Sequence, residues 1–123
     1  MPEHVLVVDD DPHIRGPVTE VLIEEGFAVA SAANGREAMQ HIAEDRPELV
    51  LLDLPMPVLT GWDVIRALHD AKAQVPIVLM SAGIPVRQEA ARQHAAGYLA
   101  KPFALDDLVA LVERITQRRT NTA

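Results

Sequence analysis

Short apolar runs recur along this chain of 123 residues, and amphipathic stretches separate them. Three runs are apolar at every position and contain many β-branched residues: residues 5–8 (VLVV), 49–52 (LVLL) and 77–80 (IVLM). This pattern is typical of strands that are buried on both faces of a parallel sheet. Residues 28–32 and 98–100 are weaker candidates for two further strands, so the pattern predicts five strands.

Apolar residues at helical spacing fill the intervals between these runs. One such stripe lies within residues 14–22 and another within residues 105–115. Shorter helices are predicted at residues 35–44, 61–71 and about 86–94. A strand-helix pair that occurs five times, with right-handed crossovers, gives the predicted fold class: α/β, a doubly wound five-stranded parallel sheet, flavodoxin-like, with strand order 2-1-3-4-5.

Most glycines and prolines fall between the predicted elements, as turn residues do. The Gly16-Pro17 pair is the exception, because it lies inside the first helical stripe. A proline inside a helix removes a backbone donor, so we expect this helix to be kinked or to start late. Asp11-Pro12, in contrast, has the pattern of an ordinary helix start, with a capping aspartate and a proline in the first turn.

Length and composition restrict the class of protein. With 49% apolar residues the chain can bury one core, so we predict one domain over residues 1–119 and a short polar tail at 120–123. The formal charge of -7 disfavours direct nucleic-acid binding, and the lack of cysteine excludes disulfides and thiol chemistry. No stretch has the length of a membrane span and no secretory signal is visible, so we expect a cytoplasmic domain without membrane contact.

Polar residues stand at the ends of four of the five predicted strands. The acidic triplet 9–11 follows the first strand, Asp53 follows the third, Ser81 ends the fourth and Lys101 follows the fifth. Open α/β sheets bind ligands just beyond the carboxyl ends of their strands, where the strand order reverses. We therefore expect these side chains to line one crevice.

The charges in this crevice indicate its chemistry. Carboxylates that lie close together repel one another and need a cation or a proton. A site made only of oxygen ligands selects a hard ion such as Mg²⁺ or Mn²⁺, which can also hold a phosphoryl group. The Ser81 hydroxyl and the Lys101 ammonium could bind the other phosphoryl oxygens. Asp53 stands alone at its strand end, so it is the natural candidate for a nucleophile.

Four motifs in order carry a resemblance to a known family: VLVVDDDP at the first strand, LVLLDLPMP with Gly61 at the third, VLMSA at the fourth and GYLAKPF at the fifth. Over essentially its full length the chain resembles the receiver domain of two-component response regulators, including the chemotaxis regulators. The resemblance implies a phosphorylation-dependent switch in a phosphorelay.

The resemblance also implies roles for single residues. Asp53 is expected to take a phosphoryl group from the phosphohistidine of a sensor histidine kinase or a histidine phosphotransfer protein. Asp9 and Asp10 are expected to bind the metal ion, together with Asp53 and the backbone carbonyl of Pro55. A downstream protein target is expected as the second partner.

The remaining family positions concern the switch. Ser81 stands where the family has threonine or serine, whose hydroxyl turns toward the phosphoryl group. Lys101 matches the family's lysine, and the bond to Pro102 after it is commonly cis. Tyr98 matches the aromatic position whose rotamer turns inward on activation.

Three features depart from the usual family pattern. Thr60 replaces an acidic residue before Gly61, and Pro55 and Gly83 occupy two variable positions that help to tune loss of the phosphoryl group. The interval from Ser81 to Lys101 is slightly short, so we expect a trimmed fourth helix.

Several functions remain open at this stage. The leading hypothesis is a signalling switch, not an enzyme, which catalyses only its own phosphotransfer and dephosphorylation. The alternative is the receiver portion of a longer multidomain transcription regulator. An aspartyl-phosphate phosphatase is disfavoured because such enzymes show Asp-x-Asp at the nucleophile strand, whereas Leu54-Pro55 follows Asp53 here.

Overall fold

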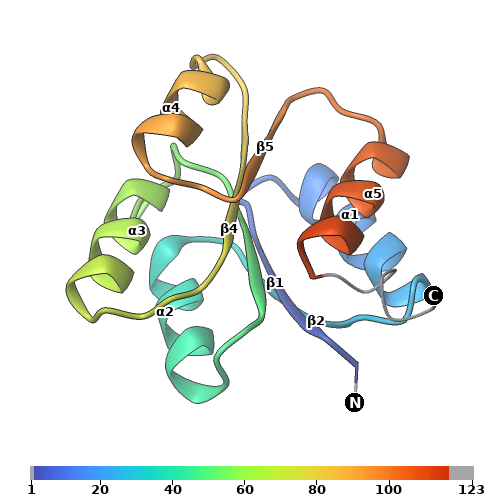
Figure 1. Cartoon of the computed structure of the whole chain (residues 1–123), viewed down its shortest axis with the longest axis horizontal. Coiled ribbons are helices and arrows are strands. Elements are labelled where there is room, and N and C mark those ends of the chain that lie inside the picture. The colour runs from blue at the N-terminus through green and yellow to red at the C-terminus, as the bar shows by residue number, and fades with distance from the viewer. Residues whose placement is uncertain (1, 117–123) are drawn as a thin grey trace.

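The computed structural model describes residues 2–116. Its five strands form one parallel sheet in the order β2-β1-β3-β4-β5 (Figure 1). The predicted fold class and strand order are therefore confirmed. The strands are β1 (His4–Val8), β2 (Ala28–Ala32), β3 (Leu49–Leu52), β4 (Ile77–Ser81) and β5 (Gly97–Ala100). All of the neighbouring strands pair in parallel.

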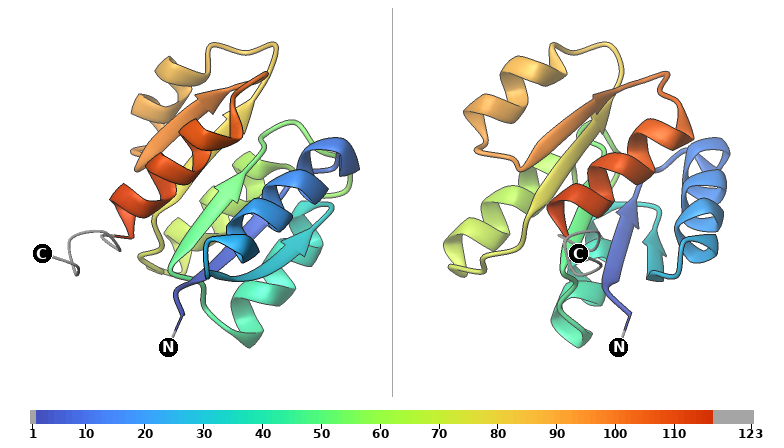
Figure 2. Two further views of the ribbon diagram at one scale, coloured as in Figure 1. Left: turned by 90° about the vertical axis from the view of Figure 1, so that its right-hand side faces the viewer. Right: turned by 45° about the vertical axis from the view of Figure 1, so that its right-hand side comes forward.

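Five helices alternate with the strands and cover both faces of the sheet (Figure 2). They are α1 (Pro12–Glu24), α2 (Gly35–Glu44), α3 (Gly61–Asp70), α4 (Val86–Arg92) and α5 (Leu105–Ile115). One core cluster joins α1 and α5 to one face, and two further clusters join α2, α3 and α4 to the other.

The continuous apolar runs have a direct explanation in this arrangement. In β1, Val5 and Val7 belong to the cluster under α1 and α5, whereas Leu6 and Val8 belong to the cluster under α2 and α3. All four side chains are at most 1% exposed. Burial of such a side chain contributes about 1.5–3 kcal/mol, so neither face of the strand tolerates a polar residue at this point.

The first helix starts where the sequence predicts it. Asp11 is the N-cap, its carboxylate accepts from the His13 amide at 2.9 Å, and Pro12 stands in the first turn. Pro17 lies inside α1, which begins five residues earlier at Pro12, so the proline does not delay the start of the helix. Gly16 before it has no Cβ to meet the proline ring, which lowers the cost of a helical conformation at that position.

The fourth helix ends two residues earlier than the sequence predicts. It stops at Arg92 because His94 adopts a left-handed conformation with φ of 56°. The amide of Ala95 then bonds back to the Ala90 carbonyl at 2.9 Å, which closes the helix end. The trimmed fourth helix that the short interval predicts is thus a helix of seven residues.

Two of the sequence expectations fall outside or at the edge of the described chain. The polar tail at 120–123, and the domain end at 119, lie outside the described residues. Within residues 2–116, no helix combines the length and the hydropathy needed to cross a bilayer.

Candidate functional site

Four neighbouring strands deliver the polar side chains to one edge of the sheet. Asp9, Asp53 and Lys101 directly follow β1, β3 and β5, and Ser81 is the last residue of β4. The Asp53 amide donates to the Val8 carbonyl at 3.0 Å, and the Lys101 amide donates to the Ser81 carbonyl at 2.9 Å. The parallel register therefore continues one residue past the strands and holds these backbones at fixed positions.

Lys101 connects the two buried carboxylates of the site. Its Nζ lies 2.8 Å from Asp9 Oδ2 and 3.5 Å from Asp53 Oδ2. Burial acts to lower the pKa of Lys101, but its bonds and charge interactions with Asp9 and Asp53 outweigh burial, so the pKa lies above its ordinary value. The lysine is therefore a fixed positive charge inside the site.

The Asp53 carboxylate is held by neutral donors as well as by this charge. Its Oδ1 accepts from the Leu54 amide at 2.9 Å and from the Ser81 hydroxyl at 2.9 Å. Burial raises the pKa of Asp53, and the nearby Asp9 charge raises it further. The hydrogen bond from Ser81, the charge of Lys101 and the hydrogen bond from the Leu54 amide lower it. The pKa of Asp53 lies above its ordinary value as the net result. The ionised form of Asp53 is therefore destabilised in this site, and an additional cation would stabilise it.

Asp9, Asp10 and Asp53 form a cluster of the kind that holds a metal ion. One carboxylate oxygen from each lies within 4.8 Å of those of the other two. Asp9 is fully buried and Asp53 nearly so, whereas Asp10 is exposed. An all-oxygen set with an excess of negative charge fits Mg²⁺ or Mn²⁺, so the residues present fit the ion. Pro55, whose carbonyl is the expected fourth ligand, lies in the exposed loop after Asp53.

Arg15 supports this cluster from α1, a role that the sequence pattern does not predict. Its Nη1 donates to the backbone carbonyl of Asp9 at 2.7 Å. The Asp9 side chain is fixed on its other side, because Oδ1 accepts from the Asp11 amide at 2.9 Å. The sequence does show an arginine one turn into the helix that follows the acidic triplet. It does not show that this arginine binds a backbone carbonyl.

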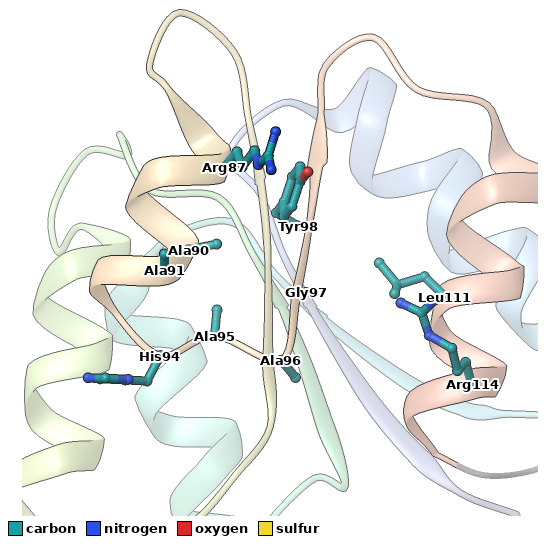
Figure 3. A pocket seen from close by; sticks show the side chains of 10 residues that line it. All are labelled: Arg87, Ala90, Ala91, His94, Ala95, Ala96, Gly97, Tyr98, Leu111 and Arg114. Atoms are coloured by element: carbon teal, nitrogen blue, oxygen red, sulfur yellow. The ribbon is translucent and has the colours of Figure 1, made fainter.

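The Ser81 hydroxyl already faces the site. It donates to Asp53 as described, and the Leu54 amide approaches its oxygen at 3.3 Å. Tyr98, two residues before β5 ends, is nevertheless 42% exposed. It lies beside Arg87 in a groove of about 770 Å³ between α4, β5 and α5 (Figure 3). An inward serine hydroxyl and an outward tyrosine therefore coexist in this structure.

Gly61 lets α3 approach the backbone of the site. A Cβ at this position would overlap the carbonyl oxygen of Asp53, and the Gly61 amide donates to the Leu54 carbonyl at 2.8 Å. Thr60, which departs from the family pattern, forms a capping box with Asp63: each side chain accepts from the other residue's amide. Thr60 is therefore a suitable N-cap residue for α3, although it is not the acidic residue of the family pattern.

The loop after Asp53 contains a strained residue. Val58 has φ of 72°, and the Leu59 amide donates to the Pro57 carbonyl at 2.8 Å across it, which is the pattern of a γ-turn. A β-branched side chain is rare in this conformation, and here it is 64% exposed. Gly83, in the loop after Ser81, has φ of 76°, a conformation that favours glycine.

Comparison with sequence families gives one match over most of the chain. Residues 5–113 match the family described as response regulator receiver domain. The transcriptional regulatory protein PrrA of Mycobacterium tuberculosis is 41% identical over 121 residues, which are 97% of this chain and 52% of that protein. The response regulator MprA of Mycolicibacterium vanbaalenii is 40% identical over 122 residues, 98% of this chain and 53% of that protein. The chain spans about half the length of these curated relatives.

Solved structures of other proteins share the fold of this chain. The response regulator TrrA of Thermotoga maritima, in complex with Mg²⁺-BeF, is 34% identical with a TM-score of 0.81, covering 92% of this chain and 98% of that one. The chemotaxis protein CheY4 of Vibrio cholerae is 32% identical with a TM-score of 0.82, covering 94% and 99%. The similarity therefore extends over nearly the whole described chain.

Proposed function

Because this chain belongs to the response regulator receiver domain family, we propose that it accepts a phosphoryl group on Asp53 and transmits the change to a partner protein. One observation carries the proposal: a buried carboxylate lies 2.9 Å from the Ser81 hydroxyl and 3.5 Å from the Lys101 ammonium. These two groups can donate to oxygens that a phosphoryl group would add beside Asp53.

The chemical step that we propose is a transfer between two side chains. A carboxylate oxygen of Asp53 attacks the phosphorus of a phosphohistidine on a histidine kinase or a histidine phosphotransfer protein. A new O–P bond forms as the N–P bond breaks, and the imidazole nitrogen keeps the electron pair of that bond. Lys101 and Ser81 bind phosphoryl oxygens as charge moves onto them.

Asp9, Asp10 and Asp53 would hold Mg²⁺ or Mn²⁺, with the carbonyl of Pro55 as a further ligand. When bound, the ion supplies positive charge that offsets both the carboxylates and the phosphoryl oxygens. Arg15 keeps the Asp9 backbone in place for this role. TrrA, which was solved with Mg²⁺-BeF, supports the assignment by similarity.

We infer that the unit acts as a signalling switch and turns over no separate substrate. Receiver domains act with histidine kinases, which are the class of partner proposed here. A second candidate is the receiver portion of a longer transcription regulator, and the half-length match to PrrA and MprA favours it. In either case we propose that the receiver unit extends to residue 119.

Phosphorylation by a small donor tests the central assignment. Acetyl phosphate with Mg²⁺ should add one acid-stable, base-labile phosphoryl group, which intact-mass spectrometry detects. Asp53→Asn should remain unlabelled, and Asp63→Asn, an acid outside the cluster, should be labelled like the wild type. Undiminished labelling of Asp53→Asn would show that another residue is the acceptor.

A further inference from the structure

A groove between α3 and α4 has a basic lining in a chain of formal charge -7. It encloses about 320 Å³. The residues that give it its character are Trp62, Arg66, His69, Arg92 and His94. No aspartate or glutamate of the described chain lines it. Such a concentration of positive charge attracts anionic groups even when the whole domain is acidic.

The basic groove continues into a neighbouring space in which most of the side chains are aliphatic. A neighbouring cavity of about 220 Å³ shares Ile65, His69, Gln93 and His94 with it. This second space is lined mainly by small or aliphatic side chains, among them Leu68, Ala73, Val75, Ala95 and Ala96. The two spaces form one elongated groove with a cationic mouth and an apolar inner end.

Glu89, the acid of α4, forms an ion pair with Arg92 and is held by Trp62 and Gln93 as well, so it offsets only part of the positive charge of the mouth. Glu89 Oε2 accepts from Trp62 Nε1 at 2.9 Å and from Gln93 Nε2 at 2.9 Å, and Oε1 lies 3.7 Å from Arg92 Nη1. The Glu89 side chain is only 12% exposed. Its bonds also join α3 to α4, so the two walls of the groove have a fixed separation.

His94 is held at the groove by an unfavourable backbone conformation. With φ of 56° it occupies the left-handed position at the end of α4, where glycine or asparagine is usual. A left-handed conformation is unfavourable for a residue that carries a Cβ atom. In Figure 3 its side chain extends away from Tyr98, on the side of α4 that faces α3. Strain that places a polar side chain at a groove is a reason to look for a function there.

We propose that this α3–α4 groove binds an acidic peptide segment of a partner protein. Carboxylates of the peptide would face Arg66 and Arg92 at the mouth, and an apolar side chain would occupy the inner end. An open, elongated groove fits a peptide better than a small metabolite, because small-molecule pockets enclose most of the ligand surface. The site is separate from the acidic crevice. It shares His94, Ala95 and Ala96 with the groove of Tyr98, whereas Trp62, Arg66 and His69 line only the α3–α4 groove.

Nuclear magnetic resonance of the ¹⁵N-labelled chain tests this proposal. The probes are a short peptide of Glu and Leu and a matched peptide in which Gln replaces each Glu. We expect only the acidic peptide to shift amides in residues 62–69 and 92–96. Arg66→Gln should weaken binding by about three- to tenfold, while Arg36→Gln on α2, outside the groove, should not.

Four outcomes would overturn the proposal. They are equal binding of the two peptides, shifts that leave residues 62–69 unchanged, an unchanged affinity of Arg66→Gln, and tighter binding of inorganic phosphate than of the acidic peptide. The last outcome would define a small-anion site instead. None of these measurements depends on phosphorylation of Asp53, so this proposal and the proposed function can fail separately.

Discussion

The Lys101 ammonium lies closer to Asp9 than to Asp53, at 2.8 Å from Asp9 Oδ2 and 3.5 Å from Asp53 Oδ2. Asp9 is fully buried, so without a metal ion this lysine is the main charge that compensates it. When a cation binds the acidic cluster, Asp9 no longer depends on the lysine. Lys101 is then free to pair with oxygens at Asp53.

This relationship predicts how Lys101→Met will behave. Removal of one partner from a buried ion pair leaves the other charge uncompensated, so the variant should lose about 2–4 kcal/mol of stability without Mg²⁺. Millimolar Mg²⁺ should restore much of the loss. Urea unfolding with and without Mg²⁺ measures both effects, with Lys72→Met, an exposed lysine, as the matched control. A loss of equal size in both lysine variants would contradict the argument.

Mg²⁺ should stabilise the wild-type domain. At a concentration of 100 times the dissociation constant, a ligand that binds only the folded state adds about 2.7 kcal/mol. Asp10→Asn should raise the metal-free stability, because it removes one repelling charge, and should abolish the Mg²⁺ effect. Thermal unfolding of the two proteins, with Asp70→Asn as a control outside the cluster, checks this. An Mg²⁺-induced shift that survives in Asp10→Asn would exclude it as a ligand.

The raised pKa of Asp53 predicts a pH dependence of stability. As the pH rises above the ordinary aspartate value of 3.8, the unfolded chain ionises this group before the folded chain does. The contribution of Asp53 to stability therefore falls across the window between 3.8 and its raised folded pKa. Asp53→Asn cannot ionise, so without Mg²⁺ it should match the wild type at low pH and exceed it at neutral pH. A stability difference that is independent of pH would contradict the raised pKa.

Gly61→Ala should strongly destabilise the domain. The added methyl group meets backbone, the Asp53 carbonyl, which cannot move away as a flexible side chain can. Such overpacking costs about 1–3 kcal/mol. Gly16→Ala is the matched control. Apart from its chain neighbours no atom lies within 4 Å of the added Cβ, so local contact with the Pro17 ring is its only cost and its effect should be the smaller of the two. Equal effects of the two substitutions in denaturant unfolding would remove the case for close approach at Gly61.

Ser81 should determine how far activation spreads. Beryllofluoride, a phosphoryl mimic, should shift amides at Tyr98 and in residues 86–94 of the wild type, and fewer of them in Ser81→Ala. Because the hydroxyl is already inward while Tyr98 is exposed, coupling through serine is expected to be loose. Ser81→Thr restores the methyl group that restricts the rotamer and should extend the shifts. Identical spread in Ser81→Ala at the same occupancy would show that the hydroxyl is not the trigger.

The parts of the fold that the sequence predicts are those that depend on burial. Strands such as β1 are covered on both faces, so every position must be apolar, and the first polar residue marks the carboxyl end where ligands bind. The same logic places Asp9, Asp53 and Lys101 together. The early end of α4 was missed because it depends on a left-handed histidine, which no local pattern specifies. Likewise, the preference of Lys101 for Asp9 and the bond from Arg15 to a backbone carbonyl depend on distances that only the folded chain defines.

The hydrogen bond from Trp62 to Glu89 makes the fluorescence of Trp62 a reporter of the contact between α3 and α4. Trp62 is the only tryptophan of the chain, and its indole N–H spans from α3 to a carboxylate on α4 at 2.9 Å. Its emission therefore has a single origin, and any event that displaces α4 from α3 changes the surroundings of that indole. Fluorescence of the unlabelled protein can follow such a displacement in real time, without a dye or an introduced residue.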